Sequence, residues 1–572
     1  MDPPPGLTRA TSYERRLLQK TAMSPPMDTV SDRVRPGADP RAAIPVDRPA
    51  HLAPQYLACL AATLGSFVMG TAIGWSGPAL SLLTLTNGTD PWAEPQEKRF
   101  EISLLDQSLI ASLMPLGALL GGLMGGYLIS VLGRHGTMYG TTVAFALFYL
   151  LMAGAETITM ILIGRFLTGV ASGVTSIAAP VYIAETSSAS VRGMLGSCFQ
   201  VMVTLGVMYV DVVGALGSWR WLCVACVAMT LVWAIALFFV PESPAYLLSQ
   251  KRFNEARLSL QFLRGHEYIE TELGDLQMTL EASANNMASF KSLATEGRYL
   301  KPLLISMILM FGQQLSGVNA VLFFSVNIFE AAGTSLNSFI ENIILAGVQV
   351  VATILASLFI DRLGRRFLLI FSALVMSLAA FGLGTYFWIL SHDPAEAHAI
   401  GFLPLSSLCV FIFAFSVGFG PIPWLMMGEL FGPEVKEKAS TVSACFNWSL
   451  AFCVTQFYSP LAHEVGSAST FWGFATVLVV IMVFSIVVVP ETKGRTLEEI
   501  QDLFRPAQSS AGRSNQPEGD LPESFGPDER PSAPLILNAD LLDDQPERER
   551  EPQTRHEPNS MSNQHRSDTV SV

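Results

Sequence analysis

Charged residues are scarce in this chain. Asp, Glu, Lys and Arg make up 15% of its 572 residues, whereas hydrophobic residues make up 50%. Soluble proteins carry about 25% charged residues. The apolar residues gather in runs of about 18–25, long enough to cross a hydrocarbon core about 30 Å thick. This composition excludes a soluble globular protein and predicts one that crosses a membrane many times.

Other signals are also missing. The first fifty residues are polar and rich in Pro and Arg, without a secretory signal, so we expect the first apolar run to act as a signal-anchor. No basic stripe is present, which excludes nucleic acid as a partner. The seven cysteines all lie in apolar runs, which predicts neither disulfides nor a metal site. All eight histidines lie outside those runs, so we expect no enzyme and no cofactor.

The apolar runs predict twelve transmembrane helices. Their approximate bounds are 56–83, 106–131, 137–154, 159–183, 194–216, 219–240, 301–328, 340–360, 367–390, 402–427, 439–460 and 470–489. We expect an all-α chain that divides into a disordered tail at 1–50, a six-helix bundle at 56–240, an intracellular helical linker at 241–300, a second bundle at 301–489 and a mostly disordered tail at 490–572. The amphipathic stretch 253–263 supports the linker helix.

Loop charges predict the orientation. Lys and Arg gather in alternate loops, and these face the cytosol when the N-terminus is placed inside. Both tails are therefore predicted to be cytoplasmic. Asn87 begins a glycosylation sequon in the first loop assigned to the outside, which predicts a modified asparagine there. The sequon at Asn447 is buried in a span, so we expect it to stay unmodified.

The two halves of the chain repeat three landmarks in the same order. Gly133-Arg134-His135 corresponds to Gly364-Arg365-Arg366, and Pro241-Glu242-Ser243 corresponds to Pro490-Glu491-Thr492. A Glu also precedes a basic residue by seven positions in each half, at 185 and 192 and at 429 and 436. The repeat predicts two pseudo-symmetric six-helix bundles that rock about a central site, the arrangement of many secondary transporters.

Several strings closely resemble the sugar porter family of the major facilitator superfamily, over about 56–503. They are Gly164-Arg165-Phe166, Pro241-Glu242-Ser243-Pro244, Gln313-Gln314-Leu315-Ser316-Gly317-Val318-Asn319, Asp361-Arg362-Leu363-Gly364-Arg365-Arg366, Gly420-Pro421-Ile422-Pro423-Trp424 and Pro490-Glu491-Thr492-Lys493-Gly494. Within the family, the chain is most similar to arthropod facilitated trehalose transporters and to facilitative glucose transporters. The resemblance implies the major facilitator fold and a hexose or trehalose as substrate.

A sugar gives up its hydrogen bonds to water on entering the membrane, at several kcal/mol each. Neutral amides replace such bonds well because they both donate and accept, and polar side chains inside spans are rare. The resemblance places six amides and two aromatic residues at the sugar: Gln200, Gln313, Gln314, Asn319, Gln349, Asn447, Trp424 and Trp448. The alternatives are that the amides join helices and that the tryptophans pack in the core.

Several spans contain residues that interrupt helices. On a straight helix, Gln313, Gln314 and Asn319 point to three different sides, so we expect an unwound turn at Gly317 to bring them together. The first helix of each three-helix unit is predicted to be a weak helix and a gate. The interrupting residues of the other three are Gly74, Gly77 and Pro78, then Pro180, and then Gly418, Gly420, Pro421 and Pro423.

Charges at the predicted cytoplasmic ends form a second candidate site. We expect them to pair across the two bundles when the pathway is closed inside and to separate when it opens; the alternative is that they only set the topology. They are Glu185, Arg192, Glu242, Asp361, Arg362, Arg365, Arg366, Glu429, Lys436 and Glu491.

Proton-driven relatives carry an Asp in the first span near an Arg of the fourth, but here the matching position in the first span is Ala72, while Arg165 is retained. Asp211 lies near an outer end, so no carboxylate is expected at mid-depth, and facilitated diffusion is predicted. A proton-coupled sugar or polyol symporter and a non-transporting sugar sensor are the alternatives. Ser416 stands where mammalian glucose carriers place a sugar-contacting Glu, which leaves room for a disaccharide.

The remaining expectations concern location and assembly. We expect a multi-pass monomer in the lipid bilayer of the plasma membrane. Leu17-Leu18 and Leu541-Leu542 leave an endolysosomal membrane open, because pairs of leucines serve as sorting signals.

Overall fold

The computed structural model describes residues 51–84, 102–188, 190–266, 269–285, 289–334, 336–432, 434–495 and 497–504. All of the described residues belong to one unit of the chain, within Met1–Ala507. The sequon at Asn87 and both leucine pairs lie outside the described residues.

The described residues form helices and no strand. The first half contains α2 (Leu52–Gly74), α3 (Ser76–Thr84), α4 (Leu104–Leu132), α5 (Arg134–Ala153), α6 (Ile158–Thr186), α7 (Arg192–Gly214) and α8 (Trp219–Leu237). Four shorter helices follow: α9 (Pro244–Ser249), α10 (Phe253–Arg264), α11 (Glu270–Asn285) and α12 (Phe290–Thr295).

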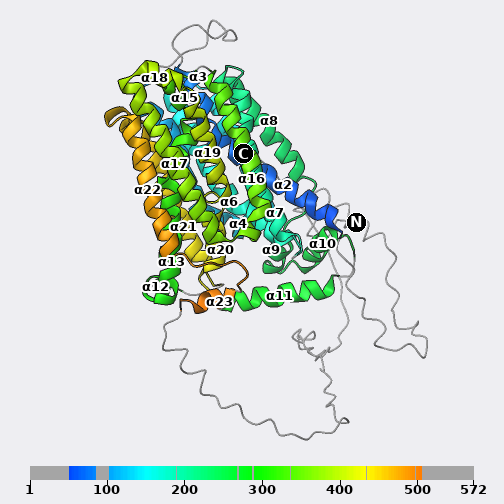
Figure 1. The fold of residues 1–572 in the computed structure, drawn as a ribbon. Coiled ribbons are helices and arrows are strands. Elements are labelled where there is room, and N and C mark those ends of the chain that lie inside the picture. The colour runs from blue at the N-terminus through cyan, green and yellow to red at the C-terminus, as the bar shows by residue number, and fades with distance from the viewer. Residues whose placement is uncertain are drawn as a thin grey trace, which may run out of the picture. The chain divides into compact units, whose positions relative to one another are not determined.

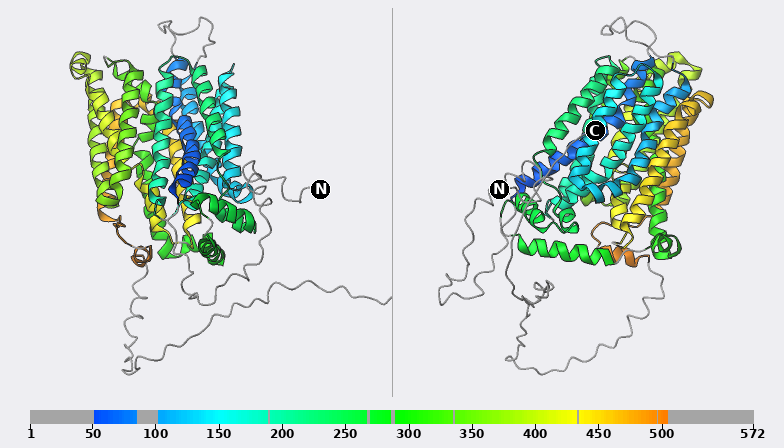
Figure 2. Two further views of the ribbon diagram at one scale, coloured as in Figure 1. Left: turned by 90° about the vertical axis from the view of Figure 1, so that its right-hand side faces the viewer. Right: turned by 180° about the vertical axis from the view of Figure 1, so that it is seen from behind.

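The second half repeats the first in its order of long helices. It contains α13 (Gly297–Leu315), α14 (Val318–Phe323), α15 (Ser325–Ala332), α16 (Ser338–Leu363), α17 (Arg365–His392), α18 (Pro394–Ala399), α19 (Leu403–Val417), α20 (Ile422–Leu430), α21 (Lys436–Glu464), α22 (Ser467–Val487) and α23 (Leu497–Asp502). Helices α9–α12 and α23 lie at one end of the bundle, which we call the linker end (Figure 1). Helices α3, α15 and α18 lie at the opposite end, and the two further views keep the same two ends apart (Figure 2).

Eleven of the predicted spans coincide with helices or helix pairs that are long and apolar enough to cross a membrane, among the residues that the structure describes. The remaining prediction, 439–460, falls within α21. This helix is continuous over 29 residues, but its charged first turn and its polar residues make it less apolar than the others. Helix α21 packs against α4 and α13 inside the bundle, and its polar residues Ser443, Asn447 and Thr455 are buried.

Small residues bring neighbouring helices into close contact. A Cβ atom added to Gly117 of α4 would lie 2.0 Å from the carbonyl oxygen of Phe166 on α6, and one on Gly121 would lie 2.0 Å from that of Val170. Within the first half, α4 packs on α6 and α2 packs on α7; between the halves, α4 packs on α21 and α7 on α16. Inside a bilayer the hydrophobic effect does not drive helices together, so close backbone packing of this kind is what holds them together.

Three of the four predicted interruptions are present. Helix α2 ends at Gly74 and α3 begins at Ser76; α13 and α14 are separated at Gly317; α19 and α20 are separated over 418–421. The prediction for the fourth span is wrong, because α6 continues unbroken through Pro180. A single proline removes one backbone donor, which a packed membrane helix tolerates, whereas the interruption between α19 and α20 combines two glycines with two prolines.

Candidate functional site

Four of the predicted sugar-binding amides meet in the interior of the second half. Gln313 and Gln314 lie in the last turn of α13, and Asn447 lies in the middle of α21. Gly317 has a φ of +87°, a left-handed conformation that glycine adopts readily. This turn redirects the chain as the sequence predicts, so Asn319 on α14 reaches Gln314. We call Gln313, Gln314, Asn319 and Asn447 the amide cluster.

Hydrogen bonds connect the amide cluster into a single chain. Asn319 Nδ2 donates to Gln314 Oε1, and Gln314 Nε2 donates to Asn447 Oδ1 at 2.9 Å. Asn447 Nδ2 donates to Gln313 Oε1 at 2.8 Å and lies 3.2 Å from Met310 Sδ. The three residues Gln313, Gln314 and Asn447 are buried and Asn319 is half-buried. The cluster is neutral, and each amide both donates and accepts, as recognition of hydroxyl groups requires.

Three of the other four predicted residues lie on other helices, and Trp448 lies beside Asn447 on α21. Gln200 is on α7, Gln349 on α16, Trp424 on α20 and Trp448 on α21. Gln349 is buried, and the other three are half-buried. Among the hydrogen bonds of the described residues, none joins any of these four side chains to the amide cluster. The structure therefore joins half of the predicted set by hydrogen bonds and leaves the other four outside those bonds.

Sequence reasoning missed the backbone carbonyls at this site. The carbonyl oxygens of Phe419 and Gly420 accept hydrogen bonds from Gln313, but every residue has a carbonyl, so no residue type marks them. Only Pro423 could have indicated Phe419, because a helical carbonyl accepts from the N–H four residues later and proline has no N–H. Ser416 was noted in the sequence; its hydroxyl is buried and has no hydrogen-bond partner among the described residues.

Arg165 is fully buried on α6, and all of its hydrogen bonds go to neutral groups. Its guanidinium donates to the carbonyls of Ala72 and Ile110 at 2.7 and 3.0 Å and to Ser76 Oγ at 2.7 Å, and it stacks on the ring of Trp75. The Ala72 carbonyl is free for this bond because α2 ends two residues later. The interruption of the first span therefore provides the partners of a buried cation.

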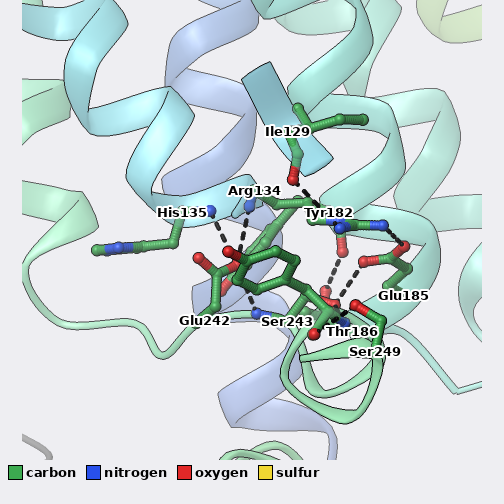
Figure 3. A network of polar contacts seen from close by, with 10 residues as sticks. Ile129, Arg134, His135, Tyr182, Glu185, Thr186, Glu242, Ser243 and Ser249 are labelled. Carbon is green, nitrogen blue, oxygen red and sulfur yellow. Dashed lines mark hydrogen bonds and ion pairs between the residues drawn. The ribbon is translucent and has the colours of Figure 1, made fainter. Parts of the chain in front are cut away.

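A polar network at the linker end of the first half surrounds Glu242 (Figure 3). The backbone N–H groups of Arg134 and His135 both donate to Glu242 Oε1 at 3.0 Å, and that of Ser243 donates at 2.8 Å. The Arg134 guanidinium forms an ion pair with Glu185 at 2.8 Å. The Ser243 hydroxyl donates to the same Glu185 carboxylate.

The second half contains the same network around Glu491. Backbone N–H groups of Arg365, Arg366, Thr492 and Lys493 donate to this carboxylate at 3.0–3.1 Å. Burial acts to raise the pKa of Glu491, but these four donors outweigh burial and lower that pKa below its usual value.

The ion pairs of the two networks also correspond. Arg365 pairs with Glu429 at 2.9 Å, as Arg134 pairs with Glu185, and the Thr492 hydroxyl donates to Glu429 at 2.5 Å. The repeat seen in the sequence is therefore a repeat of matching hydrogen bonds in space.

The predicted latch residues that form ion pairs in this structure, Glu185, Arg365 and Glu429, each pair within one half. The ion pairs given for the described residues of the two networks join helices of one half only. The Arg192 side chain lies 3.3 Å from the Ser187 carbonyl, and Arg366 donates to the Ile486 carbonyl. Pairing across the halves in another state stays a prediction.

Side-chain hydrogen bonds between the halves lie toward the opposite end. Asn342 Nδ2 on α16 donates to Asp211 Oδ1 on α7 at 2.8 Å, and both residues are buried. Ser81 on α3 donates to Glu330 on α15. Ser112 on α4 donates to Gln456 on α21 at 2.5 Å. Away from the linker end, the two halves are thus joined by polar contacts in this structure; we call the first two bonds the opposite-end contacts.

Two matching bundles of membrane-length helices with a neutral polar cluster inside the second are the arrangement expected of a membrane transporter. Comparisons with known proteins agree: the model of the family described as sugar (and other) transporter matches residues 58–504, and the chain belongs to this family. The family consists of transporters, so the chain is not an enzyme, as the sequence predicts.

Relatives among curated proteins are named facilitated trehalose transporter Tret1. That of Apis mellifera ligustica is 37% identical over 459 residues, which cover 79% of this chain and 88% of the relative. That of Culex quinquefasciatus is 38% identical, with 78% and 85% covered. That of Anopheles gambiae is 37% identical, but the match spans only 57% of its length and 80% of this chain.

Solved structures share the fold. The inward open conformation of the xylose transporter XylE from E. coli has a TM-score of 0.64 at 23% identity, over 79% of this chain and all of that one. The proton:xylose symporter XylE bound to 6-bromo-6-deoxy-D-glucose has a TM-score of 0.63 at 24% identity, with 79% and 99% covered. The fold is therefore that of the major facilitator superfamily, as predicted.

Proposed function

We propose that the chain is a facilitative transporter that moves a hexose or trehalose across the plasma membrane by alternating access, with its linker end and both tails in the cytosol. The amide cluster carries this proposal. It offers neutral donors and acceptors in the interior of one half, next to the unwound turn at Gly317. Relatives named facilitated trehalose transporters support trehalose or a similar sugar as the substrate.

We assign the sugar to a site built on the amide cluster and completed by Gln200, Gln349, Trp424 and Trp448. The amides bond to one another in this structure, and a sugar that binds there exchanges those bonds for its own and leaves few polar groups unpaired. The unpartnered hydroxyl of Ser416 is a further group that a sugar hydroxyl can satisfy.

Uniport is the form of transport that the surroundings of Arg165 support. A buried cation that is held by carbonyls and a serine needs no titrating carboxylate to change partner during the cycle. Proton coupling is the second candidate, because structural neighbours include a proton:xylose symporter.

Uptake by the purified full-length chain in liposomes tests the function. Labelled trehalose and labelled glucose should each be offered, with unlabelled trehalose, glucose, fructose and inositol as competitors. We expect saturable uptake of at least one of these sugars that stops at equal concentrations and does not speed up in an inward proton gradient. Acceleration at acid outside pH with an inward current would establish symport instead, and binding without uptake would establish a sensor.

A matched pair of variants tests the site. Asn447→Leu removes the residue that links Gln313 to Gln314, and we expect uptake to fall at least about tenfold. Ser449→Ala lies two residues away on α21, where the hydroxyl bonds only to the Cys445 carbonyl of its own helix; this control should transport normally. Equal activity of the two variants would contradict the assigned site.

A further inference from the structure

Helices α2 and α7 pack closely against each other within the first half. A Cβ atom added to Gly70 of α2 would lie 2.1 Å from the carbonyl oxygen of Val203 on α7. One added to Gly206 of α7 would lie 2.1 Å from the carbonyl oxygen of Phe67 on α2. The two backbones are therefore as close as a disulfide requires, since that bond spans Cα atoms at most about 7 Å apart.

Two cysteines face each other where this contact reaches the linker end. Cys59 lies near the start of α2 and Cys198 near the start of α7, and both are free thiols. The Cys59 thiol donates across the contact to the Leu195 carbonyl oxygen at 3.6 Å, and the Cys198 thiol donates to the Met194 carbonyl oxygen at 3.5 Å. Both sulfur atoms thus lie on adjacent carbonyls of one turn of α7, and the two thiols interact with each other.

The two thiols differ in exposure. Cys59 is 3% exposed, whereas Cys198 is half-buried. A small oxidant in solution therefore reaches Cys198 first and leaves Cys59 as the second thiol, already in place behind it. An accessible cysteine beside a second cysteine that can resolve it is the arrangement of reversible thiol oxidation.

We propose that hydrogen peroxide converts Cys59 and Cys198 into a reversible disulfide that joins α2 to α7 at the linker end. The Cys198 sulfur attacks the O–O bond of the peroxide, which leaves a sulfenic acid and releases one water. The Cys59 sulfur then displaces the hydroxyl group from that sulfenic acid as a second water. The two thiols together lose two electrons and two protons, and one peroxide becomes two waters. A thiol reductant reverses the reaction.

The bond stabilises the first half and leaves transport intact. It closes a loop of about 140 residues, which lowers the conformational entropy of the unfolded chain. Helices α2 and α7 belong to the same half, and alternating access moves each half as a unit. The disulfide therefore crosses no surface that has to open. In a reducing compartment the thiols stay free, so the bond forms only when an oxidant is present.

Peptide mass spectrometry of the purified full-length protein tests whether the bond forms. The protein is treated with hydrogen peroxide, the remaining thiols are alkylated, and disulfide-linked peptides are identified. We expect one main linked pair, Cys59 with Cys198, which disappears after dithiothreitol treatment. Absence of this pair, or oxidation of Cys198 to a sulfinic acid in its place, would overturn the proposal.

Thermal unfolding with matched variants tests what the bond does. Peroxide should raise the unfolding temperature of the unmodified chain by about 5 °C. Cys59→Ser and Cys198→Ser should each abolish this rise. Cys445→Ser is the control, because it removes another half-buried thiol, on α21, and should keep the full rise. A rise that persists in either of the first two variants, or that is lost in the control, would contradict the assigned pair.

Sugar uptake by the oxidised protein tests the last step separately. Uptake should be the same before and after peroxide treatment of the unmodified chain. Uptake that peroxide abolishes in the unmodified chain but not in Cys198→Ser would show that α2 and α7 move apart during transport, against the proposal. Absence of uptake by the reduced chain would count against the proposed function alone, because the linked peptide and the unfolding temperature still test the disulfide.

Discussion

At the scale of single residues, the two most informative side chains are charged and held by backbone groups. Arg165 bonds to two carbonyls and a serine inside the membrane span, and Glu491 accepts four N–H groups at the linker end. In both cases backbone groups stabilise a buried or half-buried charge, and the charge in turn stabilises the backbone conformation that presents those groups.

Arg165→Lys keeps the positive charge but cannot bridge three acceptors as a planar guanidinium does. We expect the variant to lose about 1–3 kcal/mol of unfolding free energy, because buried carbonyls lose their donors. Thermal unfolding in detergent measures this. Arg257→Lys is the control, since its ion pair with Glu270 is exposed on both sides and should contribute almost nothing. Similar losses in the two variants would contradict the expectation.

Glu491→Gln replaces the acceptor of four backbone donors with a weaker one. Because the pKa of Glu491 is lower in the folded chain, its carboxylate stabilises the fold at pH values above the pKa in the unfolded chain, near 4.5. This stabilisation is lost as the pH falls through the pKa of the folded chain. We expect a loss of about 1 kcal/mol at neutral pH, reduced by solvent screening. The difference in unfolding temperature between the two proteins should shrink below pH 4.5; a constant difference would contradict this.

At the scale of elements, the sequence predicted where most helices run and which of them break. Long apolar runs determined the spans, and Gly317 correctly predicted the unwound turn after α13. Pro180 misled, because one proline alone does not break a packed helix. The partners of Gln313 were not predictable, since they are carbonyls that become acceptors only after the chain has folded.

Gly317→Ala tests the turn that brings Asn319 to Gln314. A φ of +87° costs an L-residue about 1–2 kcal/mol, and the added Cβ would lie 2.4 Å from the ring of Phe474. We expect sugar uptake to be lost and the protein to be less stable. Gly347→Ala on α16 is the control, because its Cβ meets nothing within 4 Å. Normal uptake by Gly317→Ala would show that the turn is not needed.

At the scale of the whole molecule, the opposite-end contacts join the two halves, while the linker-end networks stay within each half. If alternating access operates, these contacts must break when the molecule opens at that end. The predicted exchange of ion pairs at the linker end is the other half of this cycle. Sequence reasoning could not give the state in which those charges are seen, and their role as a latch stays a prediction.

Asp211→Ala and Asn342→Ala each remove one partner of the buried bond between α7 and α16. We expect either change to shift the population toward the state that is open at the opposite end, about three- to tenfold. The double variant should shift it no further than either single one, since the bond is lost once. Labelling of Ser325→Cys, a buried position on α15, by an impermeant maleimide from outside measures the shift.

Thr204→Val on α7 is the control for this labelling, because its hydroxyl bonds only to the Val201 carbonyl of its own helix. Exchange of the pair, with Asn at 211 and Asp at 342, should restore the original labelling. Additive effects of the two single changes, or unchanged labelling, would show that the bond does not oppose opening.

The small helices at the linker end divide between the halves. Helix α10 packs on α2, and Arg264 donates to the Thr186 carbonyl of α6; α12 packs on α13, and α23 on α20. Each bundle therefore carries its own share of the covering helices and closes its own polar network. A consequence is that the peptide link between α11 and α12 is dispensable for assembly. Two separately synthesised fragments, divided there and produced in the same cell, should find each other and take up sugar.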